Sequence, residues 1–247
     1  MEKMVRTILG IEKLMDSWSG QWSSLALLSN MASILPDGRP VWRALRERGL
    51  PLVRIFGPEH GFLSEIQDAI PVEDDVLLDM EMVSLYGSRK EPEEQHMSDL
   101  DAVIIDIQDV GSRYYTYLYT AAAVMANCAD YGVEALVCDR PNPINAETIE
   151  GGPIADEHQN EVGAYGLPPR HGLTIGEFAK YFKHEYRRDL RLTVFWMSRY
   201  GRRMYYGDTK LPWKQPSPNL PTPKTALVYP GTCLFEGTNL SEGRGTT

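Results

Sequence analysis

A glutamate and a histidine follow directly after a short apolar run, in the stretch FGPEHGF. Gly57 and Pro58 turn the chain sharply, and Gly61 lets it turn again without covering Glu59 and His60. A carboxyl group and an imidazole are side chains that transfer protons in enzymes. The stretch is therefore a candidate for acid–base chemistry at the end of a predicted strand.

A second polar group follows the apolar run DAVII, in the stretch DIQDVGSRYYTY. Such a turn can present carboxylate, amide and guanidinium groups to a polyhydroxyl ligand, and a tyrosine can stack on a sugar ring. The alternative is that an aspartate only caps the following helix and that the tyrosines belong to the core. We favour the core for Tyr117 and Tyr119. The candidate site residues of this turn are Asp106, Gln108, Asp109, Arg113 and Tyr115.

Two prolines stiffen the next polar stretch, CDRPNPIN, which carries Asp139, Arg140, Asn142 and Asn145. A stiff loop can hold hydrogen-bonding groups for a ligand at little entropic cost. Asparagine turns beside a structural Asp–Arg neighbourhood explain the pattern equally well. Both interpretations stay open at this point.

Arg170 and His171 precede a helix that Thr174 and Glu177 are predicted to cap. A helix N-terminus attracts anions, and arginine can clamp a carboxylate with two hydrogen bonds. The alternative is a helix entry with a solvated arginine and a packed histidine.

The elements that must position these groups are short, continuous apolar runs separated by helical stretches. Continuous apolarity is typical of strands covered on both faces, and alternation with helices predicts right-handed βαβ units. We predict an α/β fold: a three-layer, Rossmann-like parallel sheet with long Pro/Gly-rich loops at the C-terminal ends of its strands. The expected strands span residues 24–30, 52–57, 101–107, 134–139 and 192–197, and the expected helices span 39–49, 114–131 and 174–186, after an amphipathic opening helix.

Ligands of open parallel sheets bind at the carboxyl ends of the strands. Asn30 and the polar residues of FGPEHGF, DIQDVGSRYYTY and CDRPNPIN each follow a predicted strand. These four turns are therefore expected to face one crevice.

Composition and missing motifs exclude several functions. The formal charge of −9 opposes nucleic-acid binding. There is no GxxxxGK[ST] loop, GxGxxG turn, GxSxG elbow or HExxH helix, so we expect neither a metal nor another cofactor. The chain shows no signal peptide, no apolar run of about 20 residues and three scattered cysteines, which predicts a cytoplasmic protein without a membrane partner. The sequence does not indicate an oligomeric state.

The remaining inventory of carboxylates, arginines and aromatic side chains suits glycoside chemistry, which needs an acid and a second group at the anomeric carbon. The stretches FGPEHGF, SLYG, DIQDVGSRYYTY, DRPNPIN, PRHGLTIGE, PSPNLPTP and YPGTCLFEGTNLSEGRGTT resemble, in order, the motifs of the NamZ-type exo-β-N-acetylmuramidases. This family was long catalogued as a domain of unknown function.

The resemblance implies hydrolytic release of N-acetylmuramic acid from non-reducing ends of peptidoglycan fragments. It also implies a Rossmann-like N-terminal catalytic domain, which we expect to cover residues 1–247, with the family's smaller C-terminal domain absent. The alternative is a truncated domain that binds muramyl sugars without hydrolysing them.

Carried over by motif, the resemblance assigns the general acid to Glu59 and a supporting role to His60 or Asp106. The 2-acetamido group of the substrate can act as an internal nucleophile, polarised by Asp106, Asp109 or Glu242. The Pro-rich segment 212–223 is expected to close the pocket. Candidates for the lactyl carboxylate are Arg113, Arg140, Arg170 and Arg244, and Asn239 is a further substrate-binding candidate.

Overall fold

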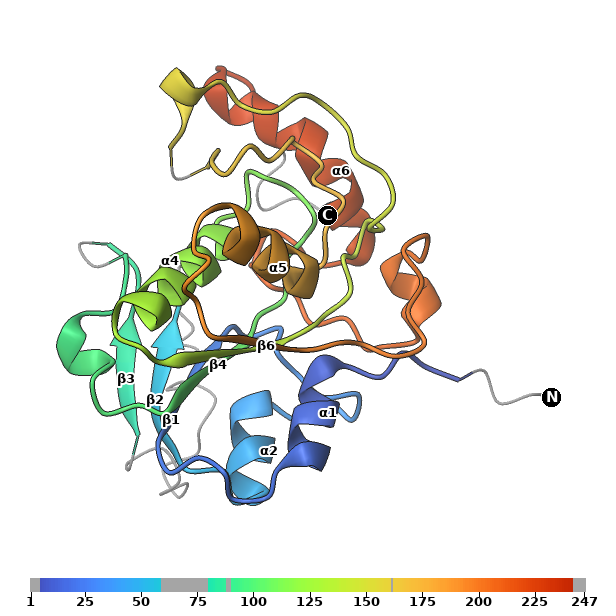
Figure 1. Ribbon diagram of the computed structural model, residues 1–247. Coiled ribbons are helices and arrows are strands. Elements are labelled where there is room, and N and C mark those ends of the chain that lie inside the picture. Colours follow the sequence, from blue (N-terminus) through green and yellow to red (C-terminus); the bar gives the residue numbers. More distant parts are fainter. Residues whose placement is uncertain (1–4, 59–79, 88–89, 161, 242–247) are drawn as a thin grey trace.

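The computed structural model describes residues 5–58, 80–87, 90–160 and 162–241 of the chain. Its centre is a six-stranded parallel sheet with the strand order β3-β2-β1-β4-β5-β6 (Figure 1). The strands are β1 (Leu25–Ser29), β2 (Leu52–Gly57), β3 (Glu81–Ser84), β4 (Ala102–Asp106), β5 (Glu134–Cys138) and β6 (Leu192–Phe195).

The prediction of a parallel α/β sheet is confirmed, and all five predicted strands are present within two residues of their expected ends. The sixth strand, β3, was not predicted. It has four residues, EMVS, pairs only with β2 at the edge of the sheet, and buries only Val83. Such a short and half-exposed strand lacks the continuous apolar run by which the others were found.

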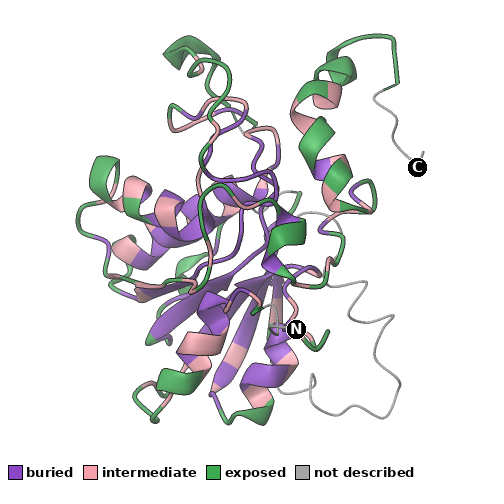
Figure 2. Ribbon diagram, turned by 90° about the vertical axis from the view of Figure 1, so that its right-hand side faces the viewer, coloured by how far each residue is buried: buried purple, intermediate pink, exposed green. Residues whose placement is uncertain are grey.

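Helices cover both faces of the sheet (Figure 1). On one face lie α4 (Tyr117–Asp130) and α5 (Ile175–Glu185), and on the other lie α1 (Gly10–Ser17) and α2 (Val41–Glu47). In β4, Val103 and Ile105 belong to the core under α4 and α5, whereas Ala102 and Ile104 belong to the core under α1 and α2. Because both faces are packed, the strands are buried throughout the centre of the sheet (Figure 2).

The helix boundaries follow local chemistry. The predicted capping box of α5 is present: Thr174 Oγ1 accepts from the Glu177 amide, and Glu177 accepts from the Thr174 amide. Helix α4 begins at Tyr117, three residues later than predicted; before it the Tyr115 amide donates to the Ser112 carbonyl in a turn, and the Arg113 amide donates to the Pro169 carbonyl. The predicted opening helix is present as α1 and begins at Gly10, after Ile8 pairs with Ser198 in a β-bridge.

Beyond residue 141 long segments with little regular structure lie over the sheet, as predicted. Tyr115 and Tyr117 both donate to the Pro216 carbonyl and hold the Pro-rich segment against α4. Helix α6 (Pro223–Thr232) follows and buries only Ala226. No helix among the described residues is long and apolar enough to cross a bilayer. The 3-10 helices are η2 (Glu94–His96), η3 (Asp156–His158), η4 (Tyr206–Thr209) and η5 (Cys233–Gly237).

Candidate functional site

The chain reverses its direction across the sheet between β1 and β4. It runs from β1 to β2 and β3 on one side, then returns to β4 and continues to β5 and β6 on the other. The loops that follow β1 and β4 therefore separate at their carboxyl ends, which is where open parallel sheets bind ligands. The candidate site lies at this point.

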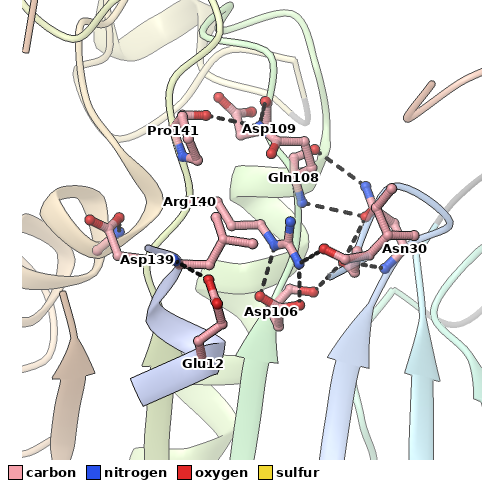
Figure 3. A network of polar contacts seen from close by, with 12 residues as sticks. Glu12, Asn30, Asp106, Gln108, Asp109, Asp139, Arg140 and Pro141 are labelled. Atoms are coloured by element: carbon pink, nitrogen blue, oxygen red, sulfur yellow. Dashed lines mark hydrogen bonds and ion pairs between the residues drawn. The ribbon is translucent and has the colours of Figure 1, made fainter. Parts of the chain in front are cut away.

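Polar contacts join the two loops across the switch point (Figure 3). Asn30 Nδ2 donates to the Gln108 carbonyl at 3.2 Å, and the Gln108 amide donates to Asn30 Oδ1 at 3.4 Å. Ser33 Oγ lies 2.6 Å from the Asp106 carbonyl oxygen and 2.9 Å from Asn30 Oδ1. A network of hydrogen bonds therefore holds the loops after β1 and β4 together at the floor of the site.

A buried ion pair forms the centre of this floor. Arg140 Nε and Nη2 donate to the two carboxylate oxygens of Asp106, each at 2.8 Å, and Nη2 also donates to the Ile34 carbonyl. Both side chains are almost completely buried. Burial alone lowers the pKa of Arg140, but the charge and hydrogen bonds of Asp106 outweigh it and raise that pKa. Asp106 is fully buried and both of its oxygens bind Arg140, so its carboxylate supports the site rather than facing a substrate.

Asp139 points away from this pair, toward α5 (Figure 3). Its Oδ1 accepts from the Gly176 amide at 2.9 Å, in the first turn of α5. A side chain at Gly176 would meet the carboxyl group of Asp139, since a Cβ there would lie 2.9 Å from Cγ. Burial raises the pKa of Asp139 to about 6, although hydrogen bonds from Thr174 and Gly176 oppose the shift. Asp139 therefore anchors a helix rather than facing the switch point.

The raised pKa makes stability depend on pH. The folded state binds the Asp139 proton more tightly than the unfolded chain does. Protonation of Asp139 therefore adds to the free energy of unfolding below about pH 4, and this added stability is lost as the pH rises through about 6. A shift from 3.8 to about 6 corresponds to about 3 kcal/mol. We expect the free energy of unfolding of the native protein to fall by about this amount relative to Asp139→Asn between pH 4 and pH 7, as measured by denaturant titration. A difference that stays constant over this range would contradict the assignment.

Gln108 and Asp109 lie above the ion pair and keep free acceptor atoms. Gln108 Nε2 donates to the Asp109 carbonyl at 2.7 Å and to the Pro141 carbonyl at 2.9 Å. Asp109 Oδ2 accepts from the Gly111 amide at 2.7 Å and lies 3.1 Å from His171 Nε2. Gln108 Oε1 and Asp109 Oδ1 are buried and have no hydrogen-bond partner among the described residues. The structure thus brings Gln108 and Asp109, which follow a predicted strand, together with His171, which was predicted only at a helix entry.

The two asparagines of the Pro-stiffened loop are used by the loop itself. Asn142 donates to the Leu173 carbonyl and accepts from the Ile144 amide. Asn145 has a φ of 70° and accepts from two amides that follow it, those of Glu147 and Thr148. Of the two interpretations of this loop, the structural one matches the contacts of these side chains.

The arginines and Tyr115 also bind the surrounding loops. Arg170 forms an ion pair with Glu150 at 2.7 Å and donates to the Ile144 carbonyl. Arg113 is half-buried and donates to the Leu167 carbonyl, and its Nε has no partner in the described ranges of the chain. Tyr115 is buried, so its ring does not form an open stacking platform.

Several predicted site residues are not brought to the switch point. Asn239 is exposed and lies beyond η5. Glu59, His60, Glu242 and Arg244 lie outside the described residues.

Two residues of the site were missed in the sequence. Ser33 joins both loops, and its signal was the asparagine three residues before it, a spacing typical of side-chain-stabilised turns. Ser112 is buried on the same turn as Asp109, and its Oγ has no hydrogen-bond partner among the described residues. No sequence pattern distinguishes it from an ordinary turn serine.

Comparisons with known proteins identify the family of the chain. The model of the N-terminal part of the exo-beta-N-acetylmuramidase NamZ matches residues 25–224. The chain belongs to the NamZ family. The model of the family's C-terminal part matches residues 227–247.

The chain is similar to a named bacterial protein and to proteins whose crystal structures have been solved. The chain is 40% identical over 243 residues to the peptidoglycan beta-N-acetylmuramidase NamZ of Bacillus subtilis, covering 96% of this chain and 59% of that protein. Two crystal structures of DUF1343 family proteins from Bacteroides fragilis superpose with TM-scores of 0.88 and 0.83, at 30% and 32% identity. Each match covers 98% of this chain and 64% or 65% of the B. fragilis protein. The chain therefore spans about three fifths of the length of these NamZ relatives.

Proposed function

We propose that this protein is an exo-acting glycoside hydrolase that releases N-acetylmuramic acid from the non-reducing ends of peptidoglycan fragments. The observation that carries the proposal is the 40% identity to a peptidoglycan beta-N-acetylmuramidase over 96% of the chain. The site supports it independently, because buried acceptor atoms at a switch point suit the hydroxyl and amide donors of a sugar.

In the proposed reaction Glu59 protonates the leaving oxygen, with His60 beside it in sequence to orient the carboxyl or handle water. Asp106 supports the reaction indirectly through its ion pair with Arg140. The Rossmann-like part of the chain thus carries the catalytic groups.

Among the described arginines, Arg113 is our candidate for the lactyl carboxylate. Arg140 Nε and Nη2 donate to Asp106, and Arg170 is held by Glu150 and the Ile144 carbonyl. Arg113 is half-buried and donates to the Leu167 carbonyl rather than to a carboxylate, and its Nε–H group, like that of Arg170, has no partner among the described residues. Arg113 can therefore donate to an anion without first leaving a carboxylate.

A chromogenic N-acetylmuramide tests the function directly. We expect the protein to release the chromophore from the muramide, and to act at least tenfold more slowly on the matching N-acetylglucosaminide, because the latter lacks the lactyl carboxylate. Binding of N-acetylmuramic acid in a calorimeter without any turnover would instead support a sugar-binding domain.

We place this activity in the cytoplasm, in the recycling of wall fragments. Cys128 and Cys138 are buried free thiols, as expected in a reducing compartment.

A further inference from the structure

Asp109 is held by one of its two carboxylate oxygens only. Oδ2 accepts from the Gly111 amide at 2.7 Å and contacts His171 Nε2 at 3.1 Å. Oδ1 is buried and has no hydrogen-bond partner in the part of the chain that the structure describes. A buried carboxylate oxygen without a donor destabilises the folded state, so a group that presents a donor to Oδ1 gains binding energy.

His171 holds Asp109 in a defined way. The Leu173 amide donates to His171 Nδ1 at 3.2 Å, so Nδ1 carries a lone pair rather than a proton. The proton of the neutral ring is then on Nε2, which donates to Asp109 Oδ2. Because Nδ1 faces a backbone N–H group, the ring cannot pass a proton through itself. His171 therefore orients Asp109 and does not take part in proton transfer.

The turn that carries Asp109 is rigid. Gly111 has a φ of 84°, and a Cβ there would lie 2.4 Å from Asn142 Oδ1, so no other residue fits this turn without displacement. Two further buried atoms on the turn, Gln108 Oε1 and Ser112 Oγ, also have no partner among the residues that the structure describes. The turn thus presents one charged acceptor between two neutral polar groups.

We propose that Asp109 Oδ1 accepts the hydrogen bond of the substrate's 2-acetamido N–H group and that His171 is the positioning residue for this contact. The inference rests on the proposed function and deepens it. Asp106 is not suited to the role because Arg140 occupies both of its oxygens. A neutral acceptor is sufficient to bind a sugar hydroxyl. A carboxylate that accepts from the acetamido N–H group also makes the acetamido carbonyl oxygen a stronger nucleophile.

The chemistry follows from this contact. The acetamido carbonyl oxygen attacks the anomeric carbon and forms a C–O bond, while the glycosidic C–O bond breaks and the leaving oxygen takes the proton of the general acid. The positive charge that develops on the acetamido group lies against Asp109. Water then adds to the anomeric carbon, reopens the acetamido group and returns a proton to the general acid.

Three variants separate positioning from structure. Asp109→Asn keeps the shape but presents an amide N–H group where Oδ1 was, so we expect kcat to fall at least a hundredfold on a chromogenic muramide. His171→Phe removes the donor and is expected to lose tenfold to a hundredfold in kcat with little change in KM. His171→Gln places an amide nitrogen near the Nε2 position and is expected to recover most of that loss. Equal losses in Phe and Gln variants that unfold like the native protein would overturn the role of His171.

A binding cycle identifies the substrate group. Calorimetry compares N-acetylmuramic acid with its 2-O-acetyl analogue, which keeps the carbonyl and lacks only the N–H. The native protein is expected to prefer the N-acetyl sugar at least tenfold, and Asp109→Asn to abolish this preference. An unchanged preference in Asp109→Asn overturns the inference, as does native turnover without any preference. Native discrimination without turnover would contradict the proposed function and leave the inference standing.

Discussion

Replacement of Glu59 by glutamine is expected to lower kcat on an N-acetylmuramide by about 10²- to 10⁴-fold. Glutamine has the shape of glutamate but no proton to give to the leaving oxygen, and departure of an alkoxide is the costly part of glycoside cleavage. KM is expected to change little, because proton transfer occurs in the transition state and not on binding.

The choice of leaving group provides the control for Glu59→Gln. A dinitrophenyl muramide needs little acid assistance, so its hydrolysis is expected to fall much less than that of a sugar-linked substrate. An equal loss on both substrates would indicate a damaged site, and full activity on the sugar-linked substrate would remove Glu59 from the acid role.

Replacement of Arg140 by methionine is expected to lower the free energy of unfolding by about 3–5 kcal/mol. The change leaves the Asp106 carboxylate buried without its two donors, at the centre of the contacts between the β1 and β4 loops. Denaturant titration measures the loss. The double variant Asp106→Leu/Arg140→Met removes the unpaired charge as well and is expected to recover part of it.

A matched surface pair controls for the loss of an arginine as such. Arg39 forms an ion pair with Glu47 at 2.6 Å, and both side chains are about half exposed. Arg39→Met is expected to leave the denaturation midpoint unchanged, because water solvates the remaining carboxylate. A double variant no more stable than Arg140→Met would contradict the assignment of the loss to an unpaired charge.

The fold could be predicted from local patterns because most elements have strong ones. Runs such as AVII in β4 are apolar on both faces, and the Thr174–Glu177 box marks the start of α5 within one residue. The edge strand β3 has neither signal. The start of α4 at Tyr117 could not be predicted either, since the turn before it is held by a bond from the Arg113 amide to Pro169, 56 positions along the chain.

The sequence predicted which residues lie at the site better than it predicted what each of them does. Strand ends predicted that the Asp106–Arg113 turn and the Asp139–Asn145 loop face one crevice, but not that His171, from a helix entry, holds one oxygen of Asp109. The partners Asp106 and Arg140 are 34 positions apart, and whether Asp139 or Arg140 faces Asp106 depends on the path of the loop after β5. Such pairings are determined by tertiary structure, because each depends on which loop lies opposite the side chain.

The most direct test of the proposed activity is the order of products from a defined peptidoglycan oligosaccharide with N-acetylmuramic acid at its non-reducing end. Mass spectrometry of a time course is expected to show free N-acetylmuramic acid as the first product, together with a remainder one sugar shorter. An oligosaccharide that stays intact at high protein concentration, or that yields internal fragments first, would contradict the account.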